Sequence, residues 1–183
     1  TIGRTRDHAS LHPGSALPFP VHEINRGGQA TYHGPGQLVG YPITDLNRCG
    51  RDLHNYVTTL ENALIEACAK FGVQARIREG LVGVWVEDRK IASIGVGVKK
   101  WIAMHGFAFN VTRESLPPFQ AITPCGIQGV QMTCLEQEMP ESGQKDDLLD
   151  RFGDAFATLW KEKFHRNSEG AECAGEHEKS FFP

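Results

Sequence analysis

Several common sequence signatures are missing, and each absence excludes a class of protein. No segment of the 183 residues approaches the roughly 18 consecutive apolar residues that a membrane-spanning helix needs, so no membrane partner is expected. The five cysteines are odd in number and form no Cys-x-x-Cys pair. That pattern argues against a zinc knuckle or a disulfide framework and predicts a cytoplasmic protein. The eight histidines are scattered, so no metal site is predicted either.

The signatures of nucleotide and nucleic-acid binding are also absent. There is no GxxxxGK[ST] phosphate-binding loop, and Gly95-Val96-Gly97 lacks the third glycine and the helix of a dinucleotide loop, so we expect no cofactor. The net charge of −3 and the pI of about 6.2 are far from the basic footprint of a nucleic-acid-binding domain. The charge is uneven, however, because residues 1–100 carry +3 and residues 101–183 carry −6. The basic half could guide an acidic partner.

The most informative feature that the sequence does contain is a glycine-rich stretch at residues 26–37, RGGQATYHGPGQ. It has four glycines and one proline in twelve residues. Glycine loses more backbone entropy on ordering than other residues do, so such a run is a poor strand or helix. In return, glycine permits positive φ angles and close approach of the main chain to a ligand. The stretch is therefore predicted to form the wall of a binding site.

The remaining pattern predicts one α+β domain, in which a mixed sheet has helices packed on one side. Amphipathic stripes predict helices over residues 52–71, capped by Asp52, and over 146–164. Cys68 lies on the first stripe, which indicates a packing role. Turns are expected at Asp88-Arg89 and Lys99-Lys100, and a loop at 116–130. Strands are expected at residues 21–25, 37–43, 73–77, 81–87, 90–98 and 101–111.

Cys125 and Lys90 are the first candidates for chemistry. Cys125 lies in the predicted loop between a rigid proline and a permissive glycine, where a thiol can face a pocket; the alternative is a chance loop thiol. Lys90 begins an otherwise apolar strand, where a lysine is most often solvated. If it points inward instead, its ammonium would favour a thiolate. A cysteine pKa lowered from about 8.5 to about 6.5 raises the thiolate fraction at neutral pH from a few per cent to a majority.

Two histidines also stand beside glycines, in His33-Gly34 and His105-Gly106, where the backbone can approach a ligand. Either histidine could act as a base or could hydrogen-bond a carbonyl to hold a turn. The second role is the favoured interpretation for both.

Four segments together resemble the octanoyltransferases of lipoate biosynthesis. They are RGGQATYHGPGQL at residues 26–38, KIASIG at 90–95, HGFAFN at 105–110 and PCG at 124–126. Their order matches that of the family over about residues 1–130. The resemblance implies the fold of the biotin and lipoate protein ligases, which agrees with the α+β prediction. It also implies a catalytic domain at residues 1–165 that lacks the family's N-terminal segment, followed by a polar, disordered tail at 166–183.

The resemblance implies transfer of octanoyl from octanoyl-acyl carrier protein to a lysine of a lipoyl domain. Such domains occur in 2-oxoacid dehydrogenases and in the glycine cleavage H protein. Cys125 would carry the acyl group as a thioester, and Lys90 would lower its pKa and assist proton transfer. Backbone N–H groups near Gly126, or in a turn at Ser93–Gly95, are expected to stabilise the oxyanion. The implied substrate-binding residues are Arg26, Gly27, Gly28, Gln29, Ala30, Thr31, Tyr32, His33, Ser93, Ile94, Gly95, Gly106, Phe107 and Ala108.

Three rival functions remain open. An ATP-dependent lipoate or biotin ligase uses a lysine but needs no cysteine nucleophile, so Cys125 favours the transferase. A lipoyl-domain octanoyl amidotransferase would use the same thioester chemistry between two lipoyl domains. A catalytically inactive acyl-binding module would need neither Cys125 nor Lys90.

Overall fold

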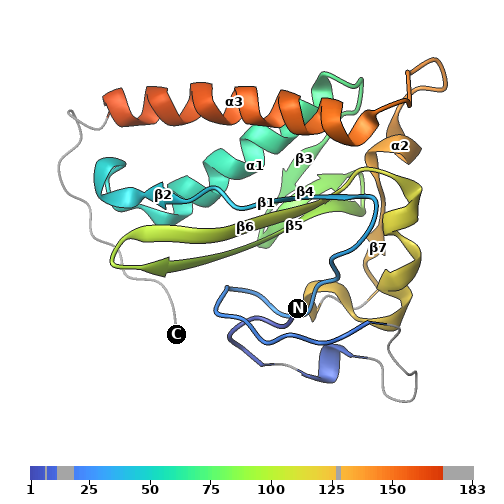
Figure 1. The fold of residues 1–183 in the computed structure, drawn as a ribbon, viewed down its shortest axis with the longest axis horizontal. Helices are drawn as coiled ribbons and strands as arrows, with labels where there is room; N and C mark the ends of the chain where they lie inside the picture. Colours follow the sequence, from blue (N-terminus) through green and yellow to red (C-terminus); the bar gives the residue numbers. More distant parts are fainter. Residues whose placement is uncertain (7, 12–18, 127–128, 171–183) are drawn as a thin grey trace.

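A mixed sheet forms the centre of the protein, as the computed structural model shows over residues 1–6, 8–11, 19–126 and 129–170 (Figure 1). The strands are β1 (Gln37–Gly40), β2 (Thr44–Asp45), β3 (Arg76–Arg78), β4 (Leu81–Val86), β5 (Arg89–Lys99), β6 (Ile102–Asn110) and β7 (Gln131–Met132). The α-helices are α1 (Leu53–Ala69), α2 (Leu135–Glu138) and α3 (Leu148–Gly170). Short 3-10 helices are η1 (His8–Ser10), η2 (Leu46–Arg48), η3 (Arg113–Ser115), η4 (Pro117–Ala121) and η5 (Pro124–Gly126).

The sheet is almost entirely antiparallel, in the order β1-β6-β5-β4-β3. β2 pairs with the first residues of β6, and β7 pairs in parallel with the first residues of β5. The prediction of a mixed sheet is therefore confirmed. The long β5–β6 hairpin runs through the middle of the molecule. It places residues that are distant in the sequence on neighbouring strands, which is how the site described below is assembled.

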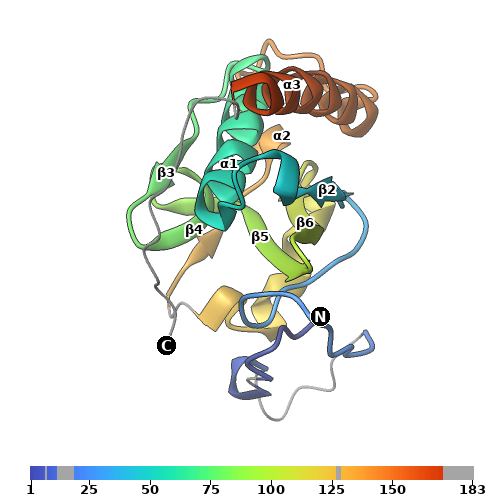
Figure 2. The same cartoon turned by 90° about the vertical axis from the view of Figure 1, so that its left-hand side faces the viewer.

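α1 and α3 cover one face of the sheet, and the N-terminal residues lie on the side away from them (Figures 1 and 2). The helices form because their apolar residues recur on one face, and that face is buried against the sheet. Phe109 of β6 and Phe152 of α3 are fully buried, and their rings stack with centroids 4.0 Å apart. Helices on one side of a sheet confirm the predicted α+β architecture. None of the helices in the described ranges is long and apolar enough to cross a membrane.

The predicted helices are close to the observed ones. α1 begins after Asp52, whose carboxylate accepts the N–H of Asn55 at 2.9 Å, so the predicted cap is confirmed. Cys68 is fully buried in the core, as its position on the apolar stripe predicted. α3 begins at Leu148 and continues to Gly170, five residues into the predicted tail. The rest of that predicted tail, residues 171–183, lies outside the described residues.

The predicted turns were wrong by one residue. The hairpins close through Glu87-Asp88 and Lys100-Trp101, because both two-residue loops use positive φ angles that the composition does not reveal. The predicted strand at 21–25 is a single bridge from Glu23 to the second residue of the chain. The predicted loop at 116–130 holds the short helices η4 and η5, with residues 127–128 outside the described ones.

Candidate active site

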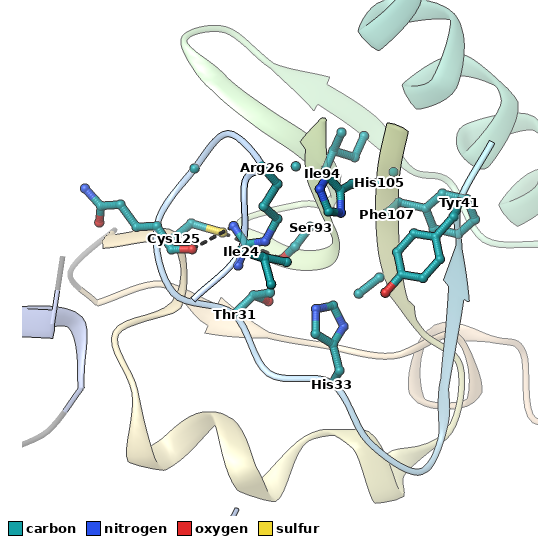
Figure 3. Close-up of a pocket in the computed structure, with 15 residues that line it drawn as sticks. Ile24, Arg26, Thr31, His33, Tyr41, Ser93, Ile94, His105, Phe107 and Cys125 are labelled. Carbon is teal, nitrogen blue, oxygen red and sulfur yellow. Dashed lines mark hydrogen bonds between the residues drawn. The ribbon is translucent and has the colours of Figure 1, made fainter. Parts of the chain in front are cut away.

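A cleft opens on the side of the sheet away from α1 and α3, between the glycine-rich stretch, β5 and β6 (Figure 3). It has about 420 Å³ of free space, part of which is open to solvent. Five separate parts of the chain form its wall. The lining residues are Ile24, Arg26, Gly28, Gln29, Thr31, His33, Tyr41, Ser93, Ile94, Gly95, His105, Gly106, Phe107, Ala108 and Cys125.

Arg26 holds the glycine-rich stretch in shape. Its side chain is buried, and Nη1 donates to the carbonyls of Gly27 at 3.0 Å and Gln29 at 2.8 Å. Nη2 donates to the carbonyl of Thr1 at 2.8 Å. The guanidinium donates to three backbone carbonyls. These carbonyls would otherwise lack the hydrogen bonds that a regular strand or helix provides. Gly95 of β5 permits this packing, since a Cβ there would lie 2.8 Å from Arg26 Cδ.

Cys125 sits in η5 with its backbone in the left-handed region, at φ 55° and ψ 20°. Its N–H donates to the carbonyl of Ala30 at 2.9 Å, which ties this loop to the glycine-rich stretch. The hydrogen bond that holds the loop is therefore made by Cys125 itself, and its thiol borders the cleft. Cys125 is one of the residues that line the cleft, which is where the sequence predicted it.

Lys90 points inward and is only 1% exposed. Its Nζ donates to the carbonyl of Val82 at 2.9 Å and lies 3.3 Å from Cys125 Sγ. The same ammonium lies over the ring of Trp85, 5.2 Å from the centroid. Ser93 Oγ lies 3.7 Å from the sulfur. A lysine side chain in contact with a cysteine sulfur is the arrangement used where a cysteine acts as a nucleophile.

Most of the predicted substrate-binding residues line the cleft, and three of them do not. Gly27 is held by a hydrogen bond from its N–H to the carbonyl of Val96 at 2.9 Å. Ala30 is buried behind the wall and supplies the carbonyl that anchors Cys125. Tyr32 packs its ring edge against Phe119, with centroids 5.7 Å apart. These three residues shape the wall rather than face the space inside it.

Of the two expected sources of oxyanion donors, the turn at Ser93–Gly95 was predicted wrongly. The N–H of Gly126 donates to the carbonyl of Thr123 at 3.1 Å, and Ser93–Gly95 is part of strand β5 rather than a turn. Two side-chain donors on lining residues, Arg26 Nε and Thr31 Oγ1, are buried without a hydrogen-bond partner among the described residues. Buried polar atoms are rarely left unpaired, so unpaired donors in a cleft indicate a place for a ligand oxygen.

The two histidines both line the cleft, but neither holds a turn in the predicted way. His33 Nε2 contacts the hydroxyl of Thr1 at 3.1 Å rather than a carbonyl. Burial, together with the positive charge of Arg26, lowers the pKa of His33 to about 4, so its ring is neutral at pH 7. His105 meets the ring of Tyr41 edge-on at 6.4 Å. No group of three His, Cys, Asp or Glu side chains in the described ranges could hold a metal ion.

Two lining residues, Ile24 and Tyr41, were missed by the sequence prediction. Both flank the glycine-rich stretch in segments that read as ordinary short strands. Tyr41 is 59% exposed although it borders the cleft. No sequence signal distinguished it from any other exposed strand residue.

Comparison with known proteins gives a consistent result. Residues 1–157 match the model of the lipoyl protein ligase A/B catalytic domain. An octanoyltransferase of Geobacter sulfurreducens is 54% identical over 138 residues, which are 75% of this chain and 57% of that protein. The chain thus spans less than two thirds of this relative.

Solved structures show the same fold at much lower identity. The bi-partite lipoate protein ligase of Thermoplasma acidophilum has a TM-score of 0.57 and 19% identity, over 78% of this chain and 57% of that chain. The biotin protein ligase of Aquifex aeolicus has a TM-score of 0.57 and 13% identity, over 74% and 55%. The predicted ligase-like fold is confirmed.

Proposed function

Since the chain belongs to the lipoyl protein ligase A/B catalytic-domain family, we propose that it is an octanoyltransferase that uses Cys125 as its nucleophile. The donor is octanoyl-acyl carrier protein, and the acceptor is a lysine of a lipoyl domain. The observation that carries this proposal is the 3.3 Å contact between Lys90 Nζ and Cys125 Sγ at the edge of the cleft. The similarity to the octanoyltransferase of Geobacter sulfurreducens also supports the proposal.

In the first step, the Cys125 thiolate attacks the carbonyl carbon of the donor thioester. A bond forms between that carbon and Cys125 Sγ, and the bond to the carrier sulfur breaks. Thioester exchange is nearly balanced in energy, so no ATP is required. The leaving carrier thiolate takes a proton from the Lys90 ammonium, which leaves Lys90 neutral.

In the second step, the neutral amine of the acceptor lysine attacks the acyl-enzyme. The amide forms, the bond to Cys125 Sγ breaks, and the thiolate is restored. Lys90, neutral after the first step, takes the proton that the amine loses. The dyad therefore returns to its starting charge state, and protons balance over the cycle.

The unpaired donors at Arg26 Nε and Thr31 Oγ1 suit the oxygen that becomes negative when the carbonyl is attacked. Both donors are buried, so they need no reorganisation at the moment of reaction. We assign them to the acyl carbonyl in place of the backbone N–H groups expected from the sequence.

The test is intact-mass spectrometry of the full-length protein mixed with octanoyl-acyl carrier protein, with and without a lipoyl domain. The protein should gain one octanoyl group, which the lipoyl domain then removes. Cys125→Ala should gain none, while Cys49→Ala, which changes a thiol outside the cleft, should behave like the unmodified protein.

Three outcomes would contradict the proposal. An octanoyl adduct on Cys125→Ala would show that another residue is the nucleophile. Adduct formation only from an octanoylated lipoyl domain would make the protein an amidotransferase. Modification that depends on ATP and free octanoate would make it a ligase.

A further inference from the structure

Glu61 is a buried carboxylate that the chemistry above does not use. It lies on α1 and is 4% exposed, and it is the one buried acidic side chain among the described residues. A carboxylate in the core is costly unless hydrogen bonds satisfy it. Glu61 Oε1 accepts the N–H of Gly83 at 2.8 Å, across the interface between α1 and β4.

The bond from Gly83 matters because of the peptide group to which its N–H belongs. That peptide joins Val82 to Gly83, and its carbonyl accepts the ammonium of Lys90 at 2.9 Å. One peptide plane is thus held at its N–H end by Glu61 and at its C=O end by Lys90. Bonds in such a chain polarise one another, and turning the peptide would break both of them.

The backbone at this point is specialised for that arrangement. Gly83 has a φ of 127°, which residues with a side chain rarely adopt. A Cβ on Gly83 would lie 2.7 Å from Lys90 Cε and 2.5 Å from the carbonyl oxygen of Ala92. The pairing of β4 with β5 begins at Val84 and shifts register between Val84 and Trp85. The Val82–Gly83 peptide lies before these pairs, and Glu61 supplies the acceptor for its N–H.

We propose that Glu61 is a positioning residue for Lys90: it fixes the Val82–Gly83 peptide so that the carbonyl holds the ammonium beside Cys125 Sγ. This inference rests on the proposed roles of Lys90 and Cys125. The carboxylate acts through the peptide and touches neither the sulfur nor the cleft. Burial raises the pKa of Glu61 above its ordinary value, and the hydrogen bond from Gly83 and the charges of His54 and Lys90, the other ionisable groups that face it, offset only part of that rise.

The experiment measures the alkylation rate of Cys125 as a function of pH, by mass spectrometry of the peptide that contains it. Glu61→Met removes the acceptor at similar volume and should lower the rate at pH 7 about fivefold, because less thiolate is present. Glu61→Gln keeps an acceptor for Gly83 and should stay within about twofold of the unmodified protein. Leu64→Ala, a fully buried change on the same helix, should lower the melting temperature without moving the pH profile.

The outcomes separate this inference from the proposed function. If Lys90→Ala shifts the profile and Glu61→Met does not, the role of Glu61 is overturned and the dyad stands. If Lys90→Ala leaves the profile unchanged, the activation of Cys125 itself is wrong. Should Glu61→Met fail to fold, NMR of the unmodified protein decides: alkylation of Cys125 must move the amide signal of Gly83 and the carboxyl signal of Glu61. Stationary signals would overturn the inference.

Discussion

Cys125 adopts a backbone conformation that places its sulfur beside Lys90 at some energetic cost. A left-handed φ of 55° costs a residue with a Cβ about 1–2 kcal/mol. The bond from its N–H to Ala30 and the rigid proline before it hold the residue there. Strained backbone concentrates at functional sites, where the surrounding structure maintains it. The sequence identified this residue as a candidate, but nothing in its spacing from Lys90 revealed that the two side chains meet.

The hydroxyl of Thr31 provides a test of the assigned oxyanion donors. Thr31→Val keeps the shape of the side chain and removes the donor, so kcat/KM with octanoyl-acyl carrier protein should fall by about 10²-fold. The melting temperature should not fall, because the hydroxyl has no partner to lose among the described residues. Thr31→Ser restores the donor and should recover most of the rate. Equal activity of Thr31→Val and the unmodified protein would contradict the assignment.

The neutral ring of His33 predicts a specific acid sensitivity. Its pKa in the folded protein is lowered to about 4, chiefly by burial, against about 6.5 in an unfolded chain. The unfolded state therefore binds more protons in this range, and the free energy of unfolding should fall as the pH drops from about 6.5 towards about 4. An NMR titration should place the ring near 4, and His33→Asn should flatten the decline. A ring that titrates at 6 or above would contradict the pKa.

At the scale of elements, the sequence predicted what periodicity and capping control. α1 was placed within two residues at its C-terminal end because its apolar stripe and Asp52 are both local signals. The parallel pairing of β7 with β5 was not predicted, because two residues, Gln131 and Met132, carry no periodic signal. The inward turn of Arg26 was also missed. Its guanidinium serves distant carbonyls, and a local pattern gives no information about such contacts.

The α2 segment is fastened to β5 by one ion pair, which predicts where stability depends on pH. Arg89 Nε and Nη2 donate to Glu138 Oε1 at 2.9 Å and Oε2 at 3.0 Å, and the hydroxyl of Thr133 donates to the same carboxylate. Burial acts to raise the pKa of Glu138, but these hydrogen bonds outweigh it, and the pKa lies below its ordinary value. Glu138→Gln should therefore cost about 1.5–3 kcal/mol of unfolding free energy near neutral pH.

The sign of the pH effect follows from that lowered pKa. The stabilisation by Glu138 is fully present above the unfolded value of about 4.3 and is lost as the pH falls through the lower folded value. In denaturant titrations, the gap between the unmodified protein and Glu138→Gln should be constant from pH 7 to pH 5 and should shrink below about pH 4. Glu114→Gln, an exposed change on η3, is the control and should show no gap. A gap that persists at pH 3 would show that the ion pair is not its source.

At the scale of the whole molecule, the main hydrophobic core and the cleft lie on opposite sides of the sheet. The main apolar core lies between the sheet and the helices, whereas the cleft lies on the side away from them (Figures 1 and 3). Phe152→Ala should therefore cost about 3–5 kcal/mol of unfolding free energy. Where the variant remains folded, it should leave the pH profile of Cys125 alkylation unchanged, because the rings that Phe152 contacts, Phe71 and Phe109, neither line the cleft nor hold Lys90 or Glu61.

Gly3 provides the opposite case, because it packs against the back of the glycine-rich stretch. A Cβ there would lie 2.0 Å from the carbonyl oxygen of Gly28 and 2.9 Å from that of Arg26, and both atoms are backbone that cannot move aside cheaply. Gly3→Ala should displace the wall of the cleft while the core between sheet and helices stays intact. We expect at least a tenfold loss of Cys125 octanoylation with a smaller fall in melting temperature than Phe152→Ala causes. If Gly3→Ala keeps octanoylation activity but lowers the melting temperature more than Phe152→Ala does, the glycine-rich stretch contributes to folding stability rather than to the site.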